Sequence, residues 1–538
     1  MNKRLISVIL LALVTLCTVG QVRNRYRVWL TDKAESSYSI DRPEEFLSTK
    51  AIERRARHNI EITQQDLPVC DSYIQQIKDL GFKIVVTSRW MNTVVVAPGD
   101  YVTINTIEQL PFVEKIECVQ NEETVIPLHA KYATRQEAVE EDDNETYPDE
   151  LVTYYGASWH QINQLNLAPM HQAGYRGNGM TIAVLDAGFY CIDMHPYIDL
   201  SQILGTHDFT RRSFSYKNGV DHGASVLMCM ATNAPNSQIG TAPDANYWLI
   251  TTEDNNRECP IEEDYWVAGA EMADSVGADI ITSSLGYNLY DDPDMSYTHA
   301  DMDGKTAFCS RGATIAASKG LLVVTAAGNE YSKTWKKIVV PGDAEGIITV
   351  GSINSDGSHS NFSSVGYSAD GRVKPDVVAL GNNTKILNTD GMITSVTGTS
   401  FATPLMTGAL VCLWQAHPEW SVAELIERVQ RGASQYHTPD SLIGYGLPDI
   451  YAIHNNANGV DSTTANSYNI YVANNTLHLP ATHHTTTLVL YDTCGRMVTS
   501  RVLAQGTNEF YLGHIERGIY IVTLSSNDIQ RAQKIIIR

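Results

Sequence analysis

The sequence predicts an α/β fold in which helices flank both faces of a parallel sheet, preceded by a small α+β unit and followed by a small β-sandwich. Apolar runs of strand length recur through the middle of the chain, and helical stretches lie between them. This alternation is typical of a parallel sheet. Regularly spaced short strands near the end of the chain are typical of a sandwich. The predicted strands cover residues 181–185, 247–251, 279–283, 321–325 and 347–351, and the predicted helices cover residues 163–173, 224–232, 265–276 and 306–317.

The first twenty residues have the pattern of a signal peptide. Lys3 and Arg4 precede an apolar run over residues 5–16, and small residues follow up to Gly20. A basic start, a short apolar run and a small-residue cleavage site are the features of an export signal. The apolar run is too short for a helix that spans a membrane. We therefore expect residues 1–20 to be cleaved off during export.

Charge and length restrict the possible partners and architectures. The chain of 538 residues carries 39 basic and 61 acidic side chains, a formal net charge of −22. Such an acidic balance disfavours nucleic acid and anionic membranes as partners. The length exceeds what a single core normally holds, so we expect several domains. The cysteines do not form the pattern of a disulfide framework, although Cys191 and Cys259 lie in loop-like stretches and could pair.

Residues 21–127 are predicted to form a separate α+β domain. Strands are expected at residues 26–30 and 92–96, and helices at residues 44–58 and 66–80. Nothing in this unit has the spacing of a catalytic site. An acidic linker is predicted to follow over residues 128–150.

The acidic linker is the most densely charged stretch of the chain. Residues 137–150 contain eight acidic residues and no Lys or Arg. Charge of this density prevents the burial of apolar area, so the stretch should be disordered. An exposed joint of this kind is suited to self-cleavage. A simple spacer is the alternative.

Two further groups of charged residues are expected to be solvated surface. One lies in the predicted helix at residues 44–58, and the other lies in a predicted acidic loop. The acidic loop could also bind calcium or basic substrate side chains, but a solvated loop is favoured. A third group, at residues 291–303, lacks the spacing of a calcium-binding EF-hand loop, so no metal is predicted. The basic group is Arg54, Arg55, Arg57 and His58, and the acidic group is Glu253, Asp254, Glu262, Glu263 and Asp264.

Residues 398–404, with the sequence GTSFATP, place Ser400 where a glycine turn becomes a helix. This position directs backbone N–H groups and the positive end of the helix dipole at the serine hydroxyl. Pro404 falls near the end of the first turn, where little of the hydrogen-bond ladder should be lost. A simple helix N-cap is an alternative explanation. The stretch also nearly matches the G-x-S-x-G motif of α/β-hydrolases, but Ala402 stands where that motif has glycine.

Two upstream stretches decide between these explanations. Asp186 ends a predicted buried strand, and His222 begins a predicted helix. The order Asp186, His222, Ser400 differs from the Ser…Asp…His order of the α/β-hydrolases and equals that of subtilisin. A fourth stretch, residues 323–329, ends a strand on Asn329. All four groups therefore lie at strand ends or helix starts, where parallel sheets bind ligands.

Residues 151–455 resemble the subtilisin-like serine peptidases, or subtilases, and the whole chain is similar to subtilases of the Bacteroidetes type. The serine motif G-T-S-x-A-x-P is present in full at residues 398–404. The histidine motif H-G-x-x-V is present at His222, with Ala224 in place of the usual threonine. The aspartate motif D-[S/T]-G is met in part, because Ala187 replaces the hydroxyl residue. We expect this replacement to remove one hydrogen bond around Asp186.

The resemblance implies a role for each residue of the site. Ser400 would be the nucleophile, His222 the general base, and Asp186 the group that orients and stabilises the imidazole. The side chain of Asn329 and the N–H of Ser400 would bind the oxyanion. Glycine and serine in the cleft walls would let an extended peptide bind as an added strand. The walls implied by the resemblance are Ser284, Leu285 and Gly286 on one side, and Ala326, Ala327 and Gly328 on the other.

These features together predict an exported serine endopeptidase without a cofactor, acting on polypeptides through an acyl-enzyme intermediate. Residues 21–127 resemble the propeptide of the family, which chaperones folding and then blocks the cleft. Two alternatives remain. One is a catalytically inactive subtilase that binds peptides at the cell surface, and the other is an esterase.

The last part of the chain is predicted to be a linker at residues 456–467 and a β-sandwich at residues 468–538. Turns and strands in this sandwich resemble the C-terminal sorting domain of type IX (Por) secretion. The resemblance implies transport through the periplasm, with the protein then secreted or held at the cell surface. The alternative is a β-module that binds carbohydrate or the peptidase itself.

Overall fold

The structure is a computed structural model that describes residues 24–457, except 101, 122–149, 211–212 and 218, and most of residues 471–537. In that last segment residues 474–475, 480–484, 493–495, 506, 508, 514, 516 and 526–529 are not described. The chain divides into two compact units between Ile453 and His454. The predicted signal peptide and nearly all of the predicted acidic linker lie outside the described residues.

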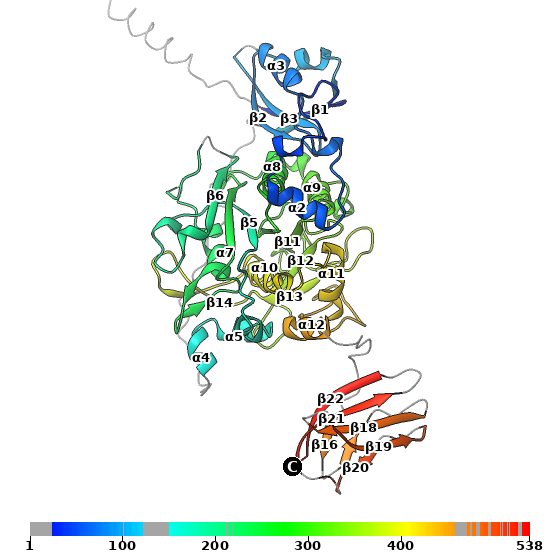
Figure 1. Ribbon diagram of the computed structural model, residues 1–538. Coiled ribbons are helices and arrows are strands. Elements are labelled where there is room, and N and C mark those ends of the chain that lie inside the picture. The colour runs from blue at the N-terminus through cyan, green and yellow to red at the C-terminus, as the bar shows by residue number, and fades with distance from the viewer. Residues whose placement is uncertain are drawn as a thin grey trace, which may run out of the picture. The chain divides into compact units, whose positions relative to one another are not determined.

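A parallel sheet of seven strands forms the centre of the first unit (Figure 1). Its strand order is β13-β12-β11-β10-β5-β9-β6, and every neighbouring pair is parallel. This confirms the predicted fold class. Two strands at the ends of the sheet, β6 and β13, were not predicted. The strands are β5 (Thr181–Asp186), β6 (Ile203–Asp208), β9 (Asn246–Thr251), β10 (Ile280–Ser283), β11 (Leu322–Ala326), β12 (Ile348–Ile353) and β13 (Val377–Leu380).

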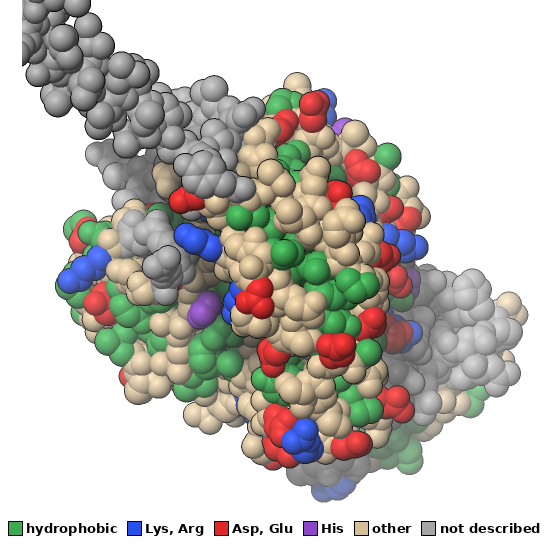
Figure 2. Space-filling model, turned by 90° about the horizontal axis from the view of Figure 1, so that it is seen from above, with side chains coloured by type: hydrophobic (Ala, Val, Ile, Leu, Met, Phe, Trp, Pro, Cys, Tyr) green, Lys and Arg blue, Asp and Glu red, His purple; other side chains and the backbone are tan. Residues whose placement is uncertain are grey.

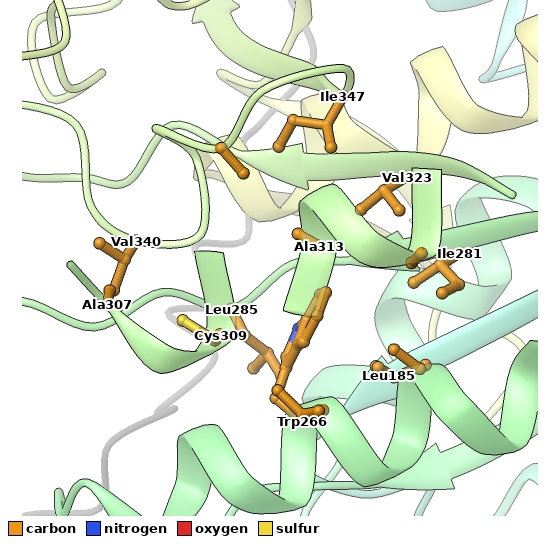
Figure 3. Close-up of a cluster of buried hydrophobic side chains, with 14 of the residues drawn as sticks. Leu185, Trp266, Ile281, Leu285, Ala307, Cys309, Ala313, Val323, Val340 and Ile347 are labelled. Carbon is orange, nitrogen blue, oxygen red and sulfur yellow. The ribbon is translucent and has the colours of Figure 1, made fainter. Parts of the chain in front are cut away.

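Helices flank the sheet on both faces, as predicted. On one face lie α8 (Ile261–Val276) and α9 (Phe308–Ser318), and on the other lie α7 (His222–Ala231) and α10 (Thr399–Ala416). Figure 3 shows Trp266 of α8 and Ala313 of α9 among side chains of the strands. The other helices and short strands of this region are α4 (Glu150–Tyr155), α5 (Trp159–Gln164), α6 (Ala168–Gln172), α11 (Val422–Arg431), α12 (Ile450–Ala457), β7 (Asn233–Ala234), β8 (Gln238–Ile239), β14 (Thr384–Leu387) and β15 (Ile393–Val396).

The helix predicted at residues 163–173 is divided into α5 and α6. Asn166 lies between them with φ = 51°, in the left-handed region. Asparagine adopts this conformation more readily than most residues, and a helix ends there. The division therefore has a local cause in the sequence.

The N-terminal part of the first unit is an antiparallel sheet with the order β2-β3-β1-β4. Val94 and Val96 of β3 pack toward α3, whereas Val95 packs toward α8. Successive side chains of a strand point to opposite faces, so the sheet lies between these two helices (Figure 1). The elements are β1 (Arg25–Leu30), β2 (Phe82–Ser88), β3 (Thr93–Pro98), β4 (Val113–Gln120), α2 (Thr49–Arg57) and α3 (Asp71–Asp79).

Both helices of this part begin later than predicted. Ser48 is the N-cap of α2 and accepts a hydrogen bond from the N–H of Ala51. Pro68 follows Leu67, which has an extended backbone with ψ = 141°. A residue before proline is disfavoured in the helical conformation, so α3 cannot begin at residue 66.

The prediction that the basic helix has a solvated face was wrong for two of its arginines. Arg54 and Arg55 of α2 are only 3% and 1% exposed, whereas Arg57 is exposed. Both buried guanidinium groups pair with Asp274 at the end of α8. Burial of a charge is tolerated when a partner and hydrogen bonds compensate for lost hydration. The partner lies more than two hundred residues away, where local sequence reasoning does not reach.

The acidic loop was also predicted wrongly as solvated. Glu262, Glu263 and Asp264 belong to the first turn of α8 and are buried. Glu263 accepts hydrogen bonds from the hydroxyls of Tyr290 and Tyr297, both at 2.6 Å. Carboxylates are stabilised near a helix N-terminus by the helix dipole. Their hydrogen bonds and position therefore make these residues part of the interior rather than a loop surface.

Within the described part of the chain, the seven cysteines have free thiols, so Cys191 and Cys259 do not pair. None of the described helices is both long and apolar enough to cross a membrane. Figure 2 shows acidic and basic side chains interspersed with hydrophobic and neutral ones on the face seen from above. On this face the negative charge is therefore not gathered into one patch.

The second unit contains two antiparallel sheets, as predicted for a small sandwich. Leu477 from one sheet and Leu488, Leu490 and Val522 from the other lie in one buried cluster. The first sheet has the order β16-β17-β20, and the second has the order β19-β18-β21-β22. The strands are β16 (Tyr471–Ala473), β17 (Thr476–His478), β18 (Thr486–Asp492), β19 (Met497–Leu503), β20 (Glu509–Tyr511), β21 (Gly518–Ser525) and β22 (Gln530–Ile537).

Candidate active site

The structure brings Asp186 and His222 together at the carboxyl end of the central sheet. Asp186 is the last residue of β5 and is completely buried, and His222 is the first residue of α7. Their side chains form a hydrogen bond of 2.7 Å between Nδ1 of the imidazole and Oδ1 of the carboxylate. Because a carboxylate only accepts, Nδ1 carries the proton and Nε2 is the basic nitrogen of the neutral ring.

The carboxylate of Asp186 is held by the backbone as well as by His222. Its Oδ1 also accepts a hydrogen bond of 2.7 Å from the N–H of Ala187. Its Oδ2 is buried and has no hydrogen-bond partner among the described residues. This agrees with the expectation that Ala187, which lacks a hydroxyl, leaves one hydrogen bond around Asp186 unmade.

The pKa of His222 is shifted by these surroundings. Burial by itself lowers the pKa of the imidazole, because it penalises the charged form. The charge of Asp186 and its hydrogen bond to the ring act in the opposite direction and prevail, with smaller contributions from Asp221 and Glu253. The pKa of His222 is therefore raised above its ordinary value of 6.5. The surroundings of His222 therefore stabilise the protonated form of its imidazole.

Ser400 is the second residue of α10, and Gly398 is the N-cap. Gly398 has φ = 152°, a conformation that residues with a Cβ rarely adopt. The first N–H groups of a helix have no acceptor within the helix, so the N–H of Ser400 is available to a ligand. The ring of Phe401, the next residue, lies 6.0 Å from the imidazole of His222 between centroids. The start of α10 therefore lies against the histidine.

Pro404 has a larger effect than predicted, because α10 begins at Thr399 and the proline is its sixth residue. Proline has no N–H, so the carbonyl of Ser400, four residues earlier, has no helical donor. The hydroxyl of Ser284 takes that place and donates to the Ser400 carbonyl at 2.8 Å. In return the hydroxyl of Ser400 donates to the Ser284 carbonyl at 3.2 Å. Two reciprocal hydrogen bonds thus join the two serines.

Asn329 lies near Ser400 with a defined amide orientation. Its Oδ1 accepts hydrogen bonds from the N–H of Thr399 at 2.9 Å and from the Thr399 hydroxyl at 3.0 Å. Both donors occupy the oxygen, so the Nδ2 group faces the other way as a hydrogen-bond donor. Thr399 was not singled out from the sequence, although its place directly before the serine in the motif was a signal.

The residues expected to form the cleft walls follow two neighbouring strands. Ser284 follows β10, Ala326 ends β11, and these two strands are hydrogen-bonded to each other. Leu285 is 2% exposed and lies in the hydrophobic cluster near Trp266 (Figure 3), so its side chain belongs to the core. Gly286 and Gly328 are partly exposed. The two segments thus begin at the same edge of the sheet as Asp186.

Residues 177–446, half of the chain, match the family model described as the subtilase family. The chain belongs to the subtilase family. Subtilisin NAT of Bacillus subtilis subsp. natto is 29% identical over 296 residues, which cover 54% of this chain and 70% of that protein. The subtilisin of Bacillus pumilus is 28% identical over 296 residues, which cover 54% of this chain and 96% of that protein. The solved structure of MycP1 from Mycobacterium smegmatis covers 61% of this chain and 89% of its own, with 20% identity and a TM-score of 0.45.

Two further family models match the regions on either side of the subtilase match. Residues 25–137 match a peptidase S8 propeptide domain of Bacteroidota, and residues 472–538 match a secretion system C-terminal sorting domain. This subtilase is therefore a serine-type endopeptidase with a propeptide domain. The sorting domain assigns it to type IX secretion, so the protein is secreted or displayed at the cell surface.

Proposed function

We propose that this subtilase cleaves polypeptides with Ser400 as the nucleophile, His222 as the general base and Asp186 as the group that orients the imidazole. The buried hydrogen bond of 2.7 Å between His222 and Asp186 carries this proposal. It leaves Nε2 of the histidine as the basic atom, and it stabilises the imidazolium that forms when a proton arrives. Asn329 and the N–H of Ser400 are assigned to the oxyanion.

The steps follow from the chemistry of these groups. The Ser400 hydroxyl turns from the Ser284 carbonyl to Nε2 of His222, which takes its proton as Oγ attacks the peptide carbonyl. The Nδ2 group of Asn329 and the N–H of Ser400 donate to the negative oxygen of the tetrahedral intermediate. His222 then gives its proton to the leaving amine, and an acyl group stays on Ser400. Water then takes the place of the amine. His222 accepts a proton from the water as it attacks the acyl group, and returns this proton to Ser400 Oγ as the acid leaves.

The substrate is proposed to bind as an extended strand between the two wall segments. Backbone N–H and C=O groups of a Gly- and Ser-rich edge pair with an extended peptide whatever its side chains are. This favours a polypeptide over a small ester. The proposed substrate-binding residues are Ser284, Leu285, Gly286, Ala326, Ala327 and Gly328.

The chain is proposed to be synthesised in six parts. The propeptide and sorting-domain matches, at residues 25–137 and 472–538, support the second and last of these parts. The parts are a signal peptide at residues 1–20, a propeptide at 21–127, an acidic linker at 128–150, the peptidase at 151–455, a linker at 456–467 and the sorting domain at 468–538.

The propeptide is proposed to chaperone the peptidase and to inhibit it. Its contact with α8 is extensive: Arg27 forms two hydrogen bonds with Asp264, at 2.8 and 2.7 Å. Glu271, in the middle of α8, accepts hydrogen bonds from the N–H groups of Arg89 and Trp90, at 2.9 and 3.0 Å. Buried charges that are paired in this way are costly to separate, because each partner is left without compensation.

Arg54 supports the chaperone role in particular. Its guanidinium donates to the carbonyl of Ala278, just beyond the end of α8, and to the carbonyl of Lys319, the C-cap of α9. The last carbonyls of a helix have no helical donor, and a cation there is favoured by the helix dipole. One propeptide side chain thus caps α9 and also binds the backbone just beyond the end of α8, which joins the C-terminal ends of these two peptidase helices.

Two measurements test the catalytic proposal. A fluorophosphonate probe should label wild-type enzyme but not Ser400→Ala, and the variant should lose about 10⁶-fold in kcat, the loss known for subtilisin itself when its serine is removed. A labelled protein that cleaves short-chain esters but not casein would indicate an esterase. An unlabelled, folded wild-type protein that still binds peptides would indicate an inactive subtilase. Proteolysis by the purified variant above about 1% of wild type would refute the role of Ser400.

A further inference from the structure

Val339 lies between the two proposed wall segments, next to Gly286 of one and Gly328 of the other. The N–H of Val339 donates to the carbonyl of Ala327 in one wall at 3.1 Å. The next residue, Val340, exchanges two backbone hydrogen bonds with Tyr287, directly after the other wall, at 2.8 and 3.1 Å. The backbone at Val339 is thus tied to both walls, and its side chain has a fixed place between them.

The isopropyl group of Val339 fills the room that the wall glycines leave. Its Cγ2 lies 2.2 Å from where a Cβ of residue 286 would be, and 3.0 Å from where a Cβ of residue 328 would be. Val339 is only 5% exposed, whereas both glycines are partly exposed. Two glycines facing each other across a cleft would otherwise make a deep slot. Here one branched side chain occupies the bottom of that slot.

The position of the reacting groups decides which part of a substrate enters this slot. Ser400 Oγ contacts the carbonyl of Ser284, at the start of one wall. Asn329 directly follows Gly328, at the end of the other wall. A peptide carbonyl placed between Ser400 Oγ and the Asn329 amide therefore has its own Cα between the walls. The side chain of the residue that supplies this carbonyl then points down toward Val339.

We propose that Val339 makes this subtilase selective for a small residue, such as alanine, glycine or serine, immediately before the cleaved bond. The proposal rests on the catalytic roles proposed above. An aromatic or long side chain would need the volume that the two methyl groups of Val339 hold. Close-packed interiors do not yield such volume without displacing backbone, and this backbone is hydrogen-bonded to both walls.

The expected preference for alanine over phenylalanine can be estimated from how strongly apolar pockets discriminate between substrates of different size. One methylene group changes the specificity constant by about 10–200-fold in an apolar pocket. The side chain of phenylalanine is larger than that of alanine by the equivalent of several methylene groups. Wild-type enzyme should therefore cleave after alanine at least about 100-fold better, in kcat/KM, than after phenylalanine.

The test compares peptide p-nitroanilides that differ only in the residue before the cleaved bond, alanine or phenylalanine. Val339→Gly should raise kcat/KM for the phenylalanine substrate by about 10–100-fold while retaining cleavage after alanine. Val339→Ala should give a smaller gain, and it serves if the glycine variant does not fold. Val340→Ala is the matched control. The completely buried side chain of Val340 lies beside Ala307 (Figure 3) and is not among the atoms nearest to a Cβ of residue 286 or 328, so the ratio of the two substrates should stay near the wild-type value.

The outcomes separate this inference from the proposed catalytic roles. Equal cleavage after alanine and phenylalanine by wild-type enzyme would overturn the inference and leave the roles intact. So would a ratio that neither Val339 variant changes. Loss of all cleavage after alanine in Ser400→Ala, together with a ratio that shifts in Val339→Gly, would support both. Undiminished cleavage after alanine by Ser400→Ala would instead overturn the catalytic roles.

Discussion

At the scale of single residues, the proposed function of the site depends on the protonation state of His222. In the proposed mechanism, His222 must be neutral to accept the proton of Ser400, and it must be stable when charged to pass that proton on. Its hydrogen bond to Asp186 serves both requirements, because it fixes Nδ1 as the donor and compensates for the burial of the imidazolium. The raised pKa of His222 has a measurable consequence for activity.

We expect kcat/KM to fall as the pH falls, with the midpoint of this acid limb above 6.5, the ordinary pKa of histidine. The sign follows from the direction of the shift: a base whose pKa is raised becomes protonated, and thus inactive, at a higher pH. In Asp186→Asn the charge that raises the pKa is gone, so the limb of the residual activity should move to lower pH. Rates measured across the neutral range test this. A wild-type midpoint below 6.5, or a limb that stays in place in the variant, would contradict the assignment.

Asn329→Ala should lower kcat by about 10²–10³-fold with little change in KM, because the proposed role of its amide is to bind a charge that exists only in the transition state. Thr399→Val is the matched comparison. It removes the hydroxyl that bonds Asn329 Oδ1 but keeps the N–H at the same oxygen, so the loss should be smaller. Steady-state kinetics on one peptide substrate distinguish the two. A raised KM with unchanged kcat in Asn329→Ala would mean that the amide binds the ground state.

At the scale of elements, the start of α10 is shaped by one missing hydrogen bond. Pro404 takes the donor away from the carbonyl of Ser400, and Ser284 at the end of β10 supplies another. A helix and a strand that are distant in the sequence are thereby joined at the proposed nucleophile, Ser400. Pro404 was expected to disturb the helix little, but it leaves the Ser400 carbonyl without a helical donor, and the hydroxyl of Ser284 binds this carbonyl instead.

Ser284→Ala should lower the free energy of unfolding by about 1–3 kcal/mol, because the buried Ser400 carbonyl is left without a donor. Adding Pro404→Ala restores an N–H four residues after Ser400, so the double variant should recover much of this loss. The measurement is chemical denaturation in an inactive His222→Ala background, which prevents self-digestion. If the effects of the two substitutions simply add, they do not share the carbonyl, and this explanation fails.

At the scale of the whole molecule, the interface between propeptide and peptidase is a network of buried charges. Asp274 of α8 forms ion pairs with three arginines of the propeptide, Arg54, Arg55 and Arg89. Asp66 of the propeptide pairs with Arg55 of the same domain and with Lys319 of the peptidase. Arg55 and Asp66 pair within the propeptide, and the other pairs of this network join the propeptide to the peptidase. Such a network favours one partner in one orientation.

Residues 21–127, produced separately, should inhibit the mature enzyme, and Arg54→Ala in this fragment should raise the inhibition constant at least about 30-fold, since breaking a buried charge pair costs roughly 2–5 kcal/mol. Arg57→Ala is the matched control on the same helix. Its side chain is exposed, so the constant should change little. Inhibition assays with a peptide substrate measure both. Equal effects of the two variants, or no inhibition at large excess, would argue against this interface as the inhibitory contact.

The sequence by itself determined the parts of this protein that depend on neighbouring residues. The apolar runs of β5, β9, β10, β11 and β12 mark strands buried on both faces, and the glycine turn before Ser400 marks the start of a helix. The order of Asp186, His222 and Ser400 then indicated the family. These features are local, because strand ends, helix caps and short motifs are set by a few consecutive residues.

Only the tertiary structure decided which polar groups are buried and what fills the cleft. Arg55 and Asp274 are 219 residues apart, and either one alone has the character of a surface charge. Edge strand β6 is half-exposed and lacks the continuous apolar run of a central strand. Val339 has no motif of its own, yet it lies between Gly286 and Gly328. The cost of burying a charge, or the volume left in a cleft, depends on partners brought together by the fold, so no stretch of sequence carries that information.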